Sequence, residues 1–298
     1  MIPFFSVIIT TFNRPNTIQR TIDSIIGQSF KDFEIIIVND GSSADYTKVQ
    51  EQIEKHSNIT YHYQENTHLS GARNKGVTLS KGRFINFIDD DDYHLPNHLA
   101  ILHKEIIKNN QADGIYHTYP KILKKNGLED LIITPRKKGY TNHEYYITDG
   151  MITVNCCCFS KNILIEFPFD TSFRIAEEHH QRLRAFNQYP VFEIKEFTSV
   201  YDKTTENSLT SNKNISVIID YLDAWNRIFS NKEVSMNIRK SIRNSIISNY
   251  LMLLINNHRN MLSYSELLEN YKKLLMTSLN IKTVIYILRT LIWKIQSR

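Results

Sequence analysis

The apolar run Phe84-Ile85-Asn86-Phe87-Ile88 is followed at once by four aspartates, Asp89-Asp90-Asp91-Asp92, and then by Tyr93. The run is typical of a short buried strand. Like-charged carboxylates about 4 Å apart repel by on the order of 4 kcal/mol per pair at an effective dielectric constant of about 20. The four aspartates must therefore be solvated, partly protonated or neutralised by a cation, and hard oxygen ligands suit Mg²⁺ or Mn²⁺. Taken alone, an acidic turn exposed to water is the competing interpretation.

Strand and helix patterns alternate on either side of this stretch. We predict strands at about 7–9, 33–38, 59–63, 84–88 and 151–160, and helices at about 15–26, 45–55, 70–82, 95–106 and 175–187. Residues 114–146 are irregular and basic, and the chain after about residue 215 has a helical pattern. Alternation of this kind predicts an α/β fold with a mostly parallel sheet covered by helices on both faces.

Polar side chains follow three of the predicted strands, at Thr10–Asn13, at Asp40 and at Asp89–Asp92. In parallel α/β sheets, ligands bind outside the carboxyl ends of the strands. Three polar clusters at the same sheet edge predict a binding site there, which argues against the acidic turn.

Composition excludes several classes of protein. The 298 residues carry a net charge of only +5, without a basic stripe in the first 210 residues, which argues against a nucleic-acid partner. The cysteines are adjacent, Cys156-Cys157-Cys158, so they form neither a zinc motif nor a disulfide framework, and we expect buried thiols in a reducing compartment. The N-terminus lacks a signal-peptide pattern, and no apolar run of about 18 residues is present.

Five motifs occur in order over roughly residues 5–210, and together they resemble family 2 glycosyltransferases of the GT-A fold, of the bacterial surface-polysaccharide type. The motifs are Ser6-Val7-Ile8-Ile9-Thr10-Thr11-Phe12-Asn13, Ile37-Val38-Asn39-Asp40-Gly41-Ser42, Gly71-Ala72-Arg73-Asn74-Lys75-Gly76, Phe87-Ile88-Asp89-Asp90-Asp91-Asp92, and Glu177-Glu178 with Arg184.

The resemblance implies a Rossmann-like GT-A catalytic domain over residues 1–214. Nucleotide-sugar binding would fall at about 1–112 and acceptor binding with the catalytic base at about 113–214. Residues 215–298 would form a helical extension that ends in a basic amphipathic helix.

The resemblance also implies roles for the residues of the donor site. Thr10, Thr11 and Phe12, with Asn13 beside them, would line the nucleobase pocket, and Asp40 would accept a hydrogen bond from uracil, which favours a UDP-sugar. Arg73 and Asn74 would contact the donor, and Asp90 the ribose. Asp89 and Asp91 would hold Mn²⁺ or Mg²⁺, while Asp92 would lie behind them or simply be exposed.

A general base is expected in the pair Glu177-Glu178. By resemblance Glu178 is the base, although the family usually has Asp there, and Glu177 contacts substrate. The neighbouring His179 and His180 diverge by about 100° on a helix and do not suit one metal ion. Relatives often have a histidine in the following loop, whereas residues 201–210 contain none and Thr205 or Glu206 falls near that place. A single displacement assisted by one base would invert the anomeric configuration.

The C-terminal segment suggests a membrane surface as a further partner. Between Lys272 and Arg298 the chain has six basic residues and no acidic one, and apolar residues recur at helical spacing within 277–298. Such a helix can lie on an anionic bilayer, or it can pack on the protein or form a dimer contact. Relatives that extend lipid-linked sugars favour a cytoplasmic protein held at the inner face of the cell membrane.

The leading hypothesis is therefore an inverting, metal-dependent glycosyltransferase. It would move a sugar from a nucleotide sugar, most simply UDP-linked, to a glycan or a polyprenyl-linked saccharide in cell-surface polysaccharide synthesis. The alternatives are a catalytically inactive module that binds nucleotide or glycan, and a sugar nucleotidyltransferase. The second lacks support because Thr10–Arg14 is not a glycine-rich phosphate loop.

Overall fold

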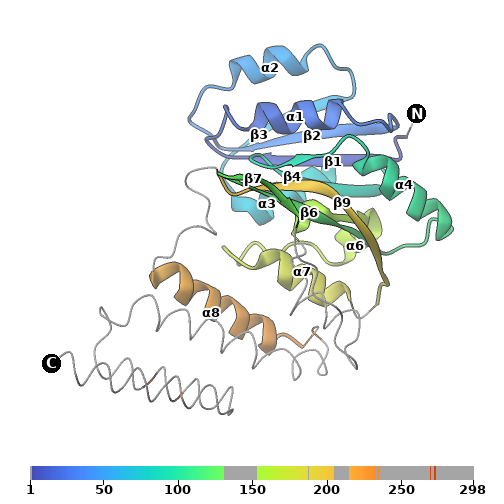
Figure 1. Ribbon diagram of the computed structural model, residues 1–298. Helices are drawn as coiled ribbons and strands as arrows, with labels where there is room; N and C mark the ends of the chain where they lie inside the picture. The colour runs from blue at the N-terminus through green and yellow to red at the C-terminus, as the bar shows by residue number, and fades with distance from the viewer. Residues whose placement is uncertain are drawn as a thin grey trace. The chain divides into compact units, whose positions relative to one another are not determined.

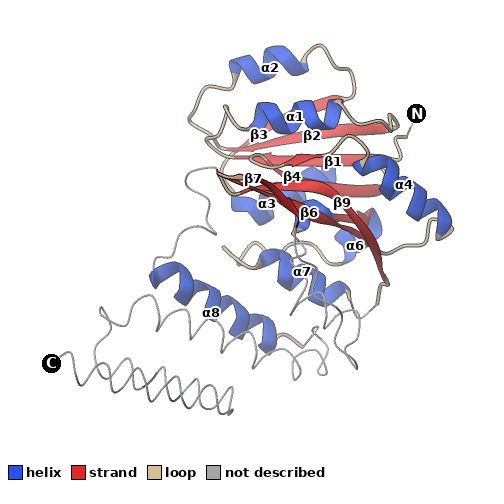
Figure 2. Cartoon of the chain, viewed as in Figure 1, coloured by secondary structure: helices blue, strands red, loops and turns tan. Residues whose placement is uncertain are grey.

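The computed structural model describes residues 2–130, 153–186, 188–204, 215–232, 234, 269 and 272. The chain forms two compact units, Met1–Ser208 and Leu209–Arg298. Figure 1 shows the first unit as a sheet with helices on both sides, and Figure 2 separates its helices from its strands.

The strands of the first unit are β1 (Phe5–Thr11), β2 (Phe33–Asp40), β3 (Ile59–Gln64), β4 (Phe84–Asp89), β5 (Tyr93–His94), β6 (Ile115–Lys124), β7 (Gly127–Asp130), β8 (Cys157–Ser160) and β9 (Val191–Asp202). Its helices are α1 (Ile18–Ile26), α2 (Thr47–Ile53), α3 (His68–Leu79), α4 (His98–Lys108), the 3₁₀ turn η1 (Val154–Cys156), α6 (Lys161–Glu166) and α7 (Glu177–Ala185). The second unit contributes α8 (Ile215–Ser230).

The first half of the sheet is parallel, as predicted. Strands β3, β2, β1 and β4 lie side by side in that order, and each neighbouring pair is parallel. Each of the predicted runs at 7–9, 33–38, 59–63 and 84–88 forms one of these strands. The α/β fold class with helices on both faces is confirmed.

The second half of the sheet mixes directions. Strand β8 is antiparallel to both β4 and β6, β9 runs parallel to β6, and β5 and β7 are antiparallel edge partners. Neither β6 nor β9 was predicted from the sequence. In β6 the polar residues His117 and Thr118 are fully buried, and Pro120 lies at an irregularity of the pairing with β9, so the apolar pattern of a strand is hidden.

Alternate residues of the parallel strands face two helical layers. Val7 and Ile9 belong to a core shared with α1 and α4, to which those helices contribute six fully buried residues, Ile18, Ile22, Ile25, Leu99, Leu102 and Ile106. On the other face, α3 approaches Ile8 so closely that a Cβ on Gly76 would lie 2.4 Å from the Ile8 Cγ2 atom. Glycine at this position therefore brings α3 against β1.

Two helix starts differ from the sequence prediction. Pro15, expected in the first turn of a helix, precedes the first helical residue of α1, Ile18. Helix α3 begins at His68 rather than near Ser70, which moves Arg73 from the first turn to the second. The loop before each helix has a feature that the sequence pattern does not reveal. Before α1, Asn13 adopts a positive φ of 56°. Before α3, the backbone N–H of Thr67 donates a hydrogen bond to Asp40.

The three cysteines are free and fully buried, as predicted. Burial raises the pKa of the Cys156 thiol to about 12 and that of Cys157 to about 11, so both stay protonated and unreactive. Cys156 ends η1, and only the last four residues of the predicted segment 151–160 form the strand β8, Cys157–Ser160.

In the second unit, Trp225 and Phe229 stack within α8 with ring centroids 5.4 Å apart. The predicted helix at 277–298 lies outside the described residues. Among the helices that are described, none is both long enough and apolar enough to traverse a bilayer.

A buried polar cluster joins β5 and α4 to β9. The rings of His94 and His98 stack 3.7 Å apart, with Ser199 3.0 Å from His94 Nδ1 and Thr198 2.7 Å from His98 Nδ1. Burial lowers the pKa of both rings, that of His98 to about 3. Both histidines are therefore neutral at physiological pH, and a proton on either ring would be buried without a counter-charge.

This cluster predicts an acid-labile fold. A histidine whose pKa is lowered on folding contributes stability above its unfolded pKa of about 6.5, and that stability is lost as the pH falls towards the folded value. For His98 we expect a loss on the order of 2 kcal/mol of unfolding free energy between pH 6.5 and pH 5. Urea unfolding of wild type and His98→Asn over this range measures it. Asparagine has no such proton to gain, so its curve should be flatter, and parallel curves would contradict the assignment.

Candidate active site

The carboxyl ends of the parallel strands meet at one sheet edge. In the register of the strands, Thr10 lies opposite Asp89 on one side and Val38 on the other, and Thr11 lies opposite Asn39. The polar residues that end β1, β2 and β4 are thus neighbours in space. The aspartate run continues from the end of β4 into β5, which pairs with β9.

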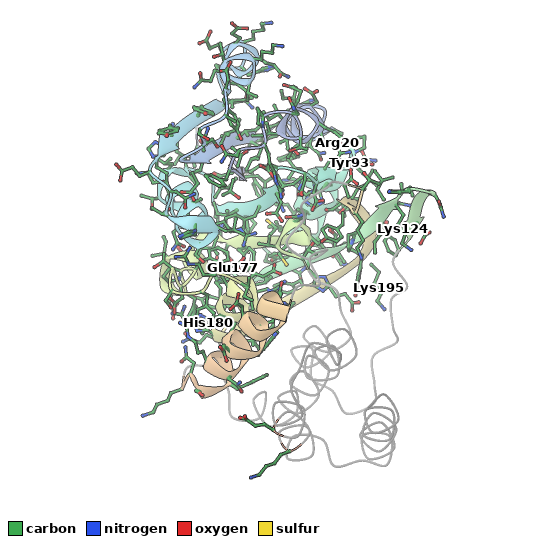
Figure 3. All side chains as sticks on the ribbon, turned by 90° about the vertical axis from the view of Figure 1, so that its left-hand side faces the viewer. Arg20, Tyr93, Lys124, Glu177, His180 and Lys195 are labelled. Atoms are coloured by element: carbon green, nitrogen blue, oxygen red, sulfur yellow. The ribbon has the colours of Figure 1, made fainter. Side chains whose placement is uncertain are left out.

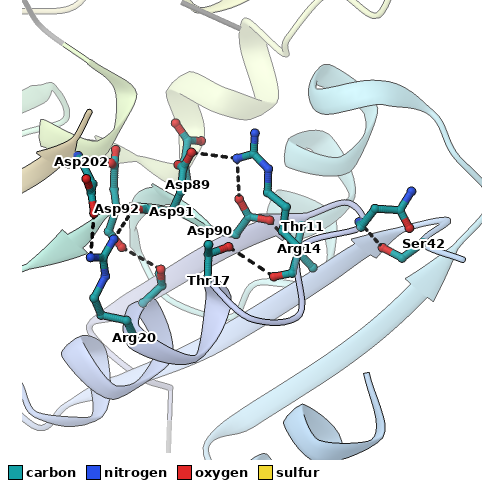
Figure 4. A network of polar contacts seen from close by, with 12 residues as sticks. Thr11, Arg14, Thr17, Arg20, Ser42, Asp89, Asp90, Asp91, Asp92 and Asp202 are labelled. Carbon is teal, nitrogen blue, oxygen red and sulfur yellow. Dashed lines mark hydrogen bonds and ion pairs between the residues drawn. The ribbon is translucent and has the colours of Figure 1, made fainter. Parts of the chain in front are cut away.

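The first three aspartates are held by two arginines, and Figure 4 shows Asp90 and Asp91 with Arg14. Asp89 keeps 36% of its side chain exposed and accepts a hydrogen bond from Arg73. Asp90 is buried and accepts from Thr11 Oγ1 at 2.7 Å and from Arg14 Nη1 at 3.1 Å. The same Arg14 Nη1 donates to Asp91 Oδ2 at 2.8 Å. One guanidinium therefore bridges the second and third aspartates.

The fourth aspartate is a buried structural link. Asp92 accepts hydrogen bonds from the side-chain amide of Asn155 and, at 2.8 Å, from the backbone N–H of Asp202. Its carbonyl oxygen accepts from Thr21 Oγ1 at 2.7 Å. Asp92 is only 1% exposed, which excludes the simply exposed position left open by the sequence.

Arg20 reinforces the same corner. It pairs with Asp202 at 2.7 Å, donates to the carbonyl of Asp91 at 2.6 Å, and lies 4.8 Å from the ring centroid of Tyr93. Figure 3 shows Arg20 and Tyr93 together at the edge of the sheet. The end of β9, the start of β5 and helix α1 are thereby held against the aspartates.

Arg73 connects the aspartates to α7. The side chain is buried, and its Nη1 lies 2.8 Å from Glu177 Oε1 while its Nη2 lies 3.1 Å from Asp89 Oδ1. Its guanidinium also lies 5.4 Å from the ring centroid of Phe169. Burial raises the pKa of Glu177, and the Arg73 cation opposes that shift.

Glu178 has a different environment from Glu177. Its Oε2 accepts a hydrogen bond from the backbone N–H of Val154 at 2.9 Å, and Arg182 Nη2 lies 3.7 Å from the same oxygen. Burial would raise the pKa of Glu178, but the charges of Arg182, His179 and Arg73 and the Val154 N–H outweigh it, so the pKa lies below its usual range. Glu178 is therefore an ionised carboxylate at the first turn of α7.

The residues expected at the nucleobase side form a second cluster. Asp40 is buried, and its Oδ1 accepts hydrogen bonds from Gln64 Nε2 and from the N–H and hydroxyl of Thr67, at 2.8 to 3.0 Å. Asn13 Oδ1 accepts from the backbone N–H groups of Ser43 and Ala44, which ties the loop after β1 to the loop after β2.

The remaining expected residues differ in how they relate to this edge. Thr10 is buried at the end of β1, and Phe12 exposes 48% of its surface. Asn74 does not meet the acidic cluster, because its side-chain amide exchanges two hydrogen bonds with the backbone of Phe169.

Carboxylates outnumber guanidiniums in the acidic cluster. Among the described residues, the carboxyls are Asp89, Asp90, Asp91, Asp92, Asp202, Glu177 and Glu178, and the guanidiniums that contact them are Arg14, Arg20, Arg73 and Arg182. Burial raises the pKa of Asp90 to about 7 and also raises those of Asp91 and Asp92. This excess of buried negative charge, with oxygen ligands only, fits a hard divalent cation.

A complete metal-ligand set is not assembled by the described residues. They contain no group of three or more His, Cys, Asp or Glu side chains in a metal-binding arrangement. His179 Nε2 lies 4.0 Å from Glu178, and His180 stacks on Phe173 at 4.5 Å, so neither histidine joins the aspartates. Thr205 and Glu206, which fall near the place of the family histidine, lie outside the described residues.

Sequence reasoning missed several residues of this network, including Arg182, which lies 3.7 Å from Glu178 where the predicted motif named Arg184. Arg14 directly follows the motif that ends at Asn13, and that adjacency was an available signal. Arg20 lies in the first turn of α1. Asn155 and Asp202 had no signal, because Asn155 lies in the turn η1 before β8 and Asp202 ends β9, which was not predicted.

Comparisons with known proteins identify the family and the fold. The model of the family described as "Glycosyl transferase family 2" matches residues 6–167. An uncharacterized glycosyltransferase of Rickettsia bellii is 36% identical over 105 residues, 35% of this chain and 15% of that protein. The GalNAc(5)-diNAcBac-PP-undecaprenol beta-1,3-glucosyltransferase of Campylobacter jejuni is 39% identical over 103 residues, 34% of this chain and 33% of that protein. The chain thus spans a third or less of the length of these curated relatives.

Solved structures share the fold. S. aureus TarS 1-349 in complex with UDP-GlcNAc superposes with a TM-score of 0.67 at 15% identity, over 92% of this chain and 81% of that one. The mannosyltransferase PcManGT from Pyrobaculum calidifontis, in complex with GDP-Man and Mn²⁺, gives a TM-score of 0.61 at 14% identity, over all of this chain and 88% of that one. The fold is therefore GT-A. Because the family model matches more than half of the 298 residues, the chain belongs to glycosyl transferase family 2.

Proposed function

We propose that the protein is an inverting, metal-dependent glycosyltransferase that transfers a sugar from a UDP-sugar to a glycan or lipid-linked saccharide. One observation carries this proposal: in the described part of the chain, a cluster in which carboxylates outnumber the guanidiniums that contact them lies beside an ionised glutamate, Glu178, on the adjoining helix. Such a pairing suits a reaction with a negatively charged leaving group and an acceptor that must lose a proton.

The nucleotide would bind at the ends of β1 and β2. The exposed ring of Phe12 can stack on a base, and Asp40 is fixed by Gln64 and Thr67 in an orientation from which it can receive the N3–H of uracil. Asp90 would contact the ribose. Arg73 would support the donor site by holding Asp89 and Glu177 in place.

Asp89 and Asp91 would hold Mn²⁺ or Mg²⁺. Asp89 is the most exposed of the four aspartates in the run, and Asp91 is bound on one side by the guanidinium of Arg14, which a divalent cation could displace. A divalent cation at this place would stabilise the charge that develops on the departing nucleoside diphosphate.

Glu178 would remove the proton from the acceptor hydroxyl as that oxygen attacks the anomeric carbon. Its carboxylate is ionised and has a free fraction of surface, since 24% of the side chain is exposed. Glu177 is a poorer candidate, because its carboxylate is buried against Arg73. A single displacement of this kind inverts the configuration at the anomeric carbon.

The acceptor proposal rests on the relatives. The Campylobacter jejuni relative is named for a saccharide carried on PP-undecaprenol, which is a membrane-bound lipid. The basic, acid-free sequence from Lys272 to Arg298 would suit peripheral contact with the inner face of the cell membrane. We therefore propose a lipid-linked or glycan acceptor and no nucleic-acid partner.

Substitution Asp91→Asn tests the metal role. We expect the release of UDP from UDP-sugars with Mn²⁺ to fall by about 10²-fold or more, because several kcal/mol of leaving-group stabilisation are lost. The donors to be screened are UDP-glucose, UDP-galactose, their N-acetyl forms and GDP-mannose. Asp32→Asn, at an exposed aspartate before β2, is the matched control and should stay active. An active Asp91→Asn variant would refute the role.

Substitution Glu178→Gln tests the base. We expect kcat to fall by about 10²- to 10⁴-fold with little change in the KM for the donor, because the amide cannot take the proton. Glu51→Gln, exposed on α2, is the matched control. If wild type binds UDP but neither it nor the variant releases nucleotide from any donor, the protein is instead a binding module without catalytic activity.

Deletion of residues 277–298 tests the membrane contact. We expect the truncated protein to shift from the membrane fraction to the supernatant on centrifugation, because each basic residue near an anionic surface contributes about 1 kcal/mol. High salt should release the full chain in the same way. Unchanged sedimentation of the truncated protein would count against the proposal.

A further inference from the structure

Two consecutive residues of η1 contact both the base and the aspartate run. The backbone N–H of Val154 donates to Glu178 Oε2 at 2.9 Å. Asn155 Oδ1 accepts from the backbone N–H of Asp89 at 3.1 Å, and its Nδ2 donates to Asp92 Oδ2. The turn thus lies between Glu178 on α7 and the first and last aspartates of the run, Asp89 and Asp92.

The turn is itself held rigidly. Val154 and Asn155 are each 2% exposed, and the backbone N–H of Cys156 donates to the carbonyl of Thr153 at 3.1 Å. Ser199 Oγ of β9 donates to the carbonyl of Asn155 at 3.4 Å. Because both sides of the turn are buried and hydrogen-bonded, movement of η1 would disturb contacts on β4, β9 and α7 together.

We propose that Val154 and Asn155 form a positioning bridge that fixes the Glu178 carboxylate relative to the aspartate run. Val154 acts through its main-chain N–H on Glu178, and Asn155 acts through its side chain on the Asp89 backbone and on Asp92. The catalytic consequence of the bridge rests on the proposed function of Glu178 as the base.

The other groups around Glu178 do not fix its orientation in the same way. Arg182 and His179 lie at 3.7 and 4.0 Å on α7 itself, so they move with Glu178. Arg73 of α3 acts on Glu178 through its charge, and Cys157 of β8 is a protonated thiol. The Val154 N–H is a directional contact from outside α7, and donation to Oε2 favours the ionised carboxylate.

Proline at position 154 removes this one donor with little change to the backbone. Val154 is the first residue of η1, where proline is tolerated, and the preceding Thr153 is extended with φ −81° and ψ 155°, as a residue before proline should be. Val154→Ala is the matched control, because it trims the side chain and keeps the N–H. Val154→Ala can still donate the hydrogen bond to Glu178, and Val154→Pro cannot.

The first measurement needs no substrate. A glutamate whose pKa is lowered on folding contributes stability above its unfolded pKa, and that stability is lost as the pH falls through the folded value. Urea unfolding from pH 7 to pH 3 should show a smaller loss of stability for Val154→Pro than for Val154→Ala, because the pKa of Glu178 is less depressed without the N–H. Both variants should lose the same stability if the N–H does not act on Glu178.

The second measurement is UDP release from the active UDP-sugar with Mn²⁺. Relative to Val154→Ala, Val154→Pro should lower kcat by about 10- to 100-fold. This factor corresponds to the free energy that a hydrogen bond to a charged group contributes. The KM for the donor should stay within about twofold, and the acid limb of the kcat profile should move to higher pH. A purely structural role would change kcat without moving that limb.

Asn155→Ala provides a second variant if proline prevents folding. It releases both aspartate contacts, so we expect the acid limb to move to higher pH and the binding of Mn²⁺ alone, followed by calorimetry, to weaken severalfold. Equal pH profiles in Val154→Pro and Val154→Ala, or in Asn155→Ala and wild type, overturn the bridge. If the unfolding curves differ as expected but wild type turns over no nucleotide sugar, the proposed function fails, and the catalytic role of the bridge fails with it.

Discussion

Buried negative charge at the end of β4 is the constraint on which the rest of the site depends. A buried charge left without a partner costs several kcal/mol, so each carboxylate of the run must find a cation or a donor. The structure meets this need with guanidiniums from separate elements: Arg14 from the loop after β1, Arg20 from α1 and Arg73 from α3. The charges therefore decide which elements lie against the carboxyl ends of the strands.

Within the described residues the neutralisation is incomplete, which is consistent with a ligand site rather than a purely structural network. Burial raises the pKa of Asp90 to about 7, so near neutral pH the folded protein holds this carboxyl between its charged and protonated forms. A ligand that brings positive charge binds the folded state alone and removes part of this cost. Functional sites commonly keep such local conflicts, while the surrounding sheet and its apolar core supply the stability.

Most of the parallel half of the sheet and its helices could be predicted, because the strands are continuous apolar runs and the helices have regular apolar spacing. The same logic placed Thr10, Asp40 and Asp89 at one edge, since parallel strands end together. Strand β6 escaped prediction because its buried positions include His117, Thr118 and Pro120. Asn155 was missed for a different reason: its position depends on antiparallel β8, whose pairing with β4 no local pattern specifies.

The two adjacent glutamates of α7 have opposite pKa shifts because the helix directs their side chains into different environments. Neighbouring residues on a helix point about 100° apart, so Glu177 and Glu178 cannot share one environment. Glu177 turns to Arg73, where burial raises its pKa, and Glu178 turns to the Val154 N–H, where Arg182 and the other donors lower its pKa. A carboxylate that is held in a buried ion pair is poorly placed to take a proton from a hydroxyl. The charged and partly exposed Glu178 is therefore the glutamate that we propose for that step.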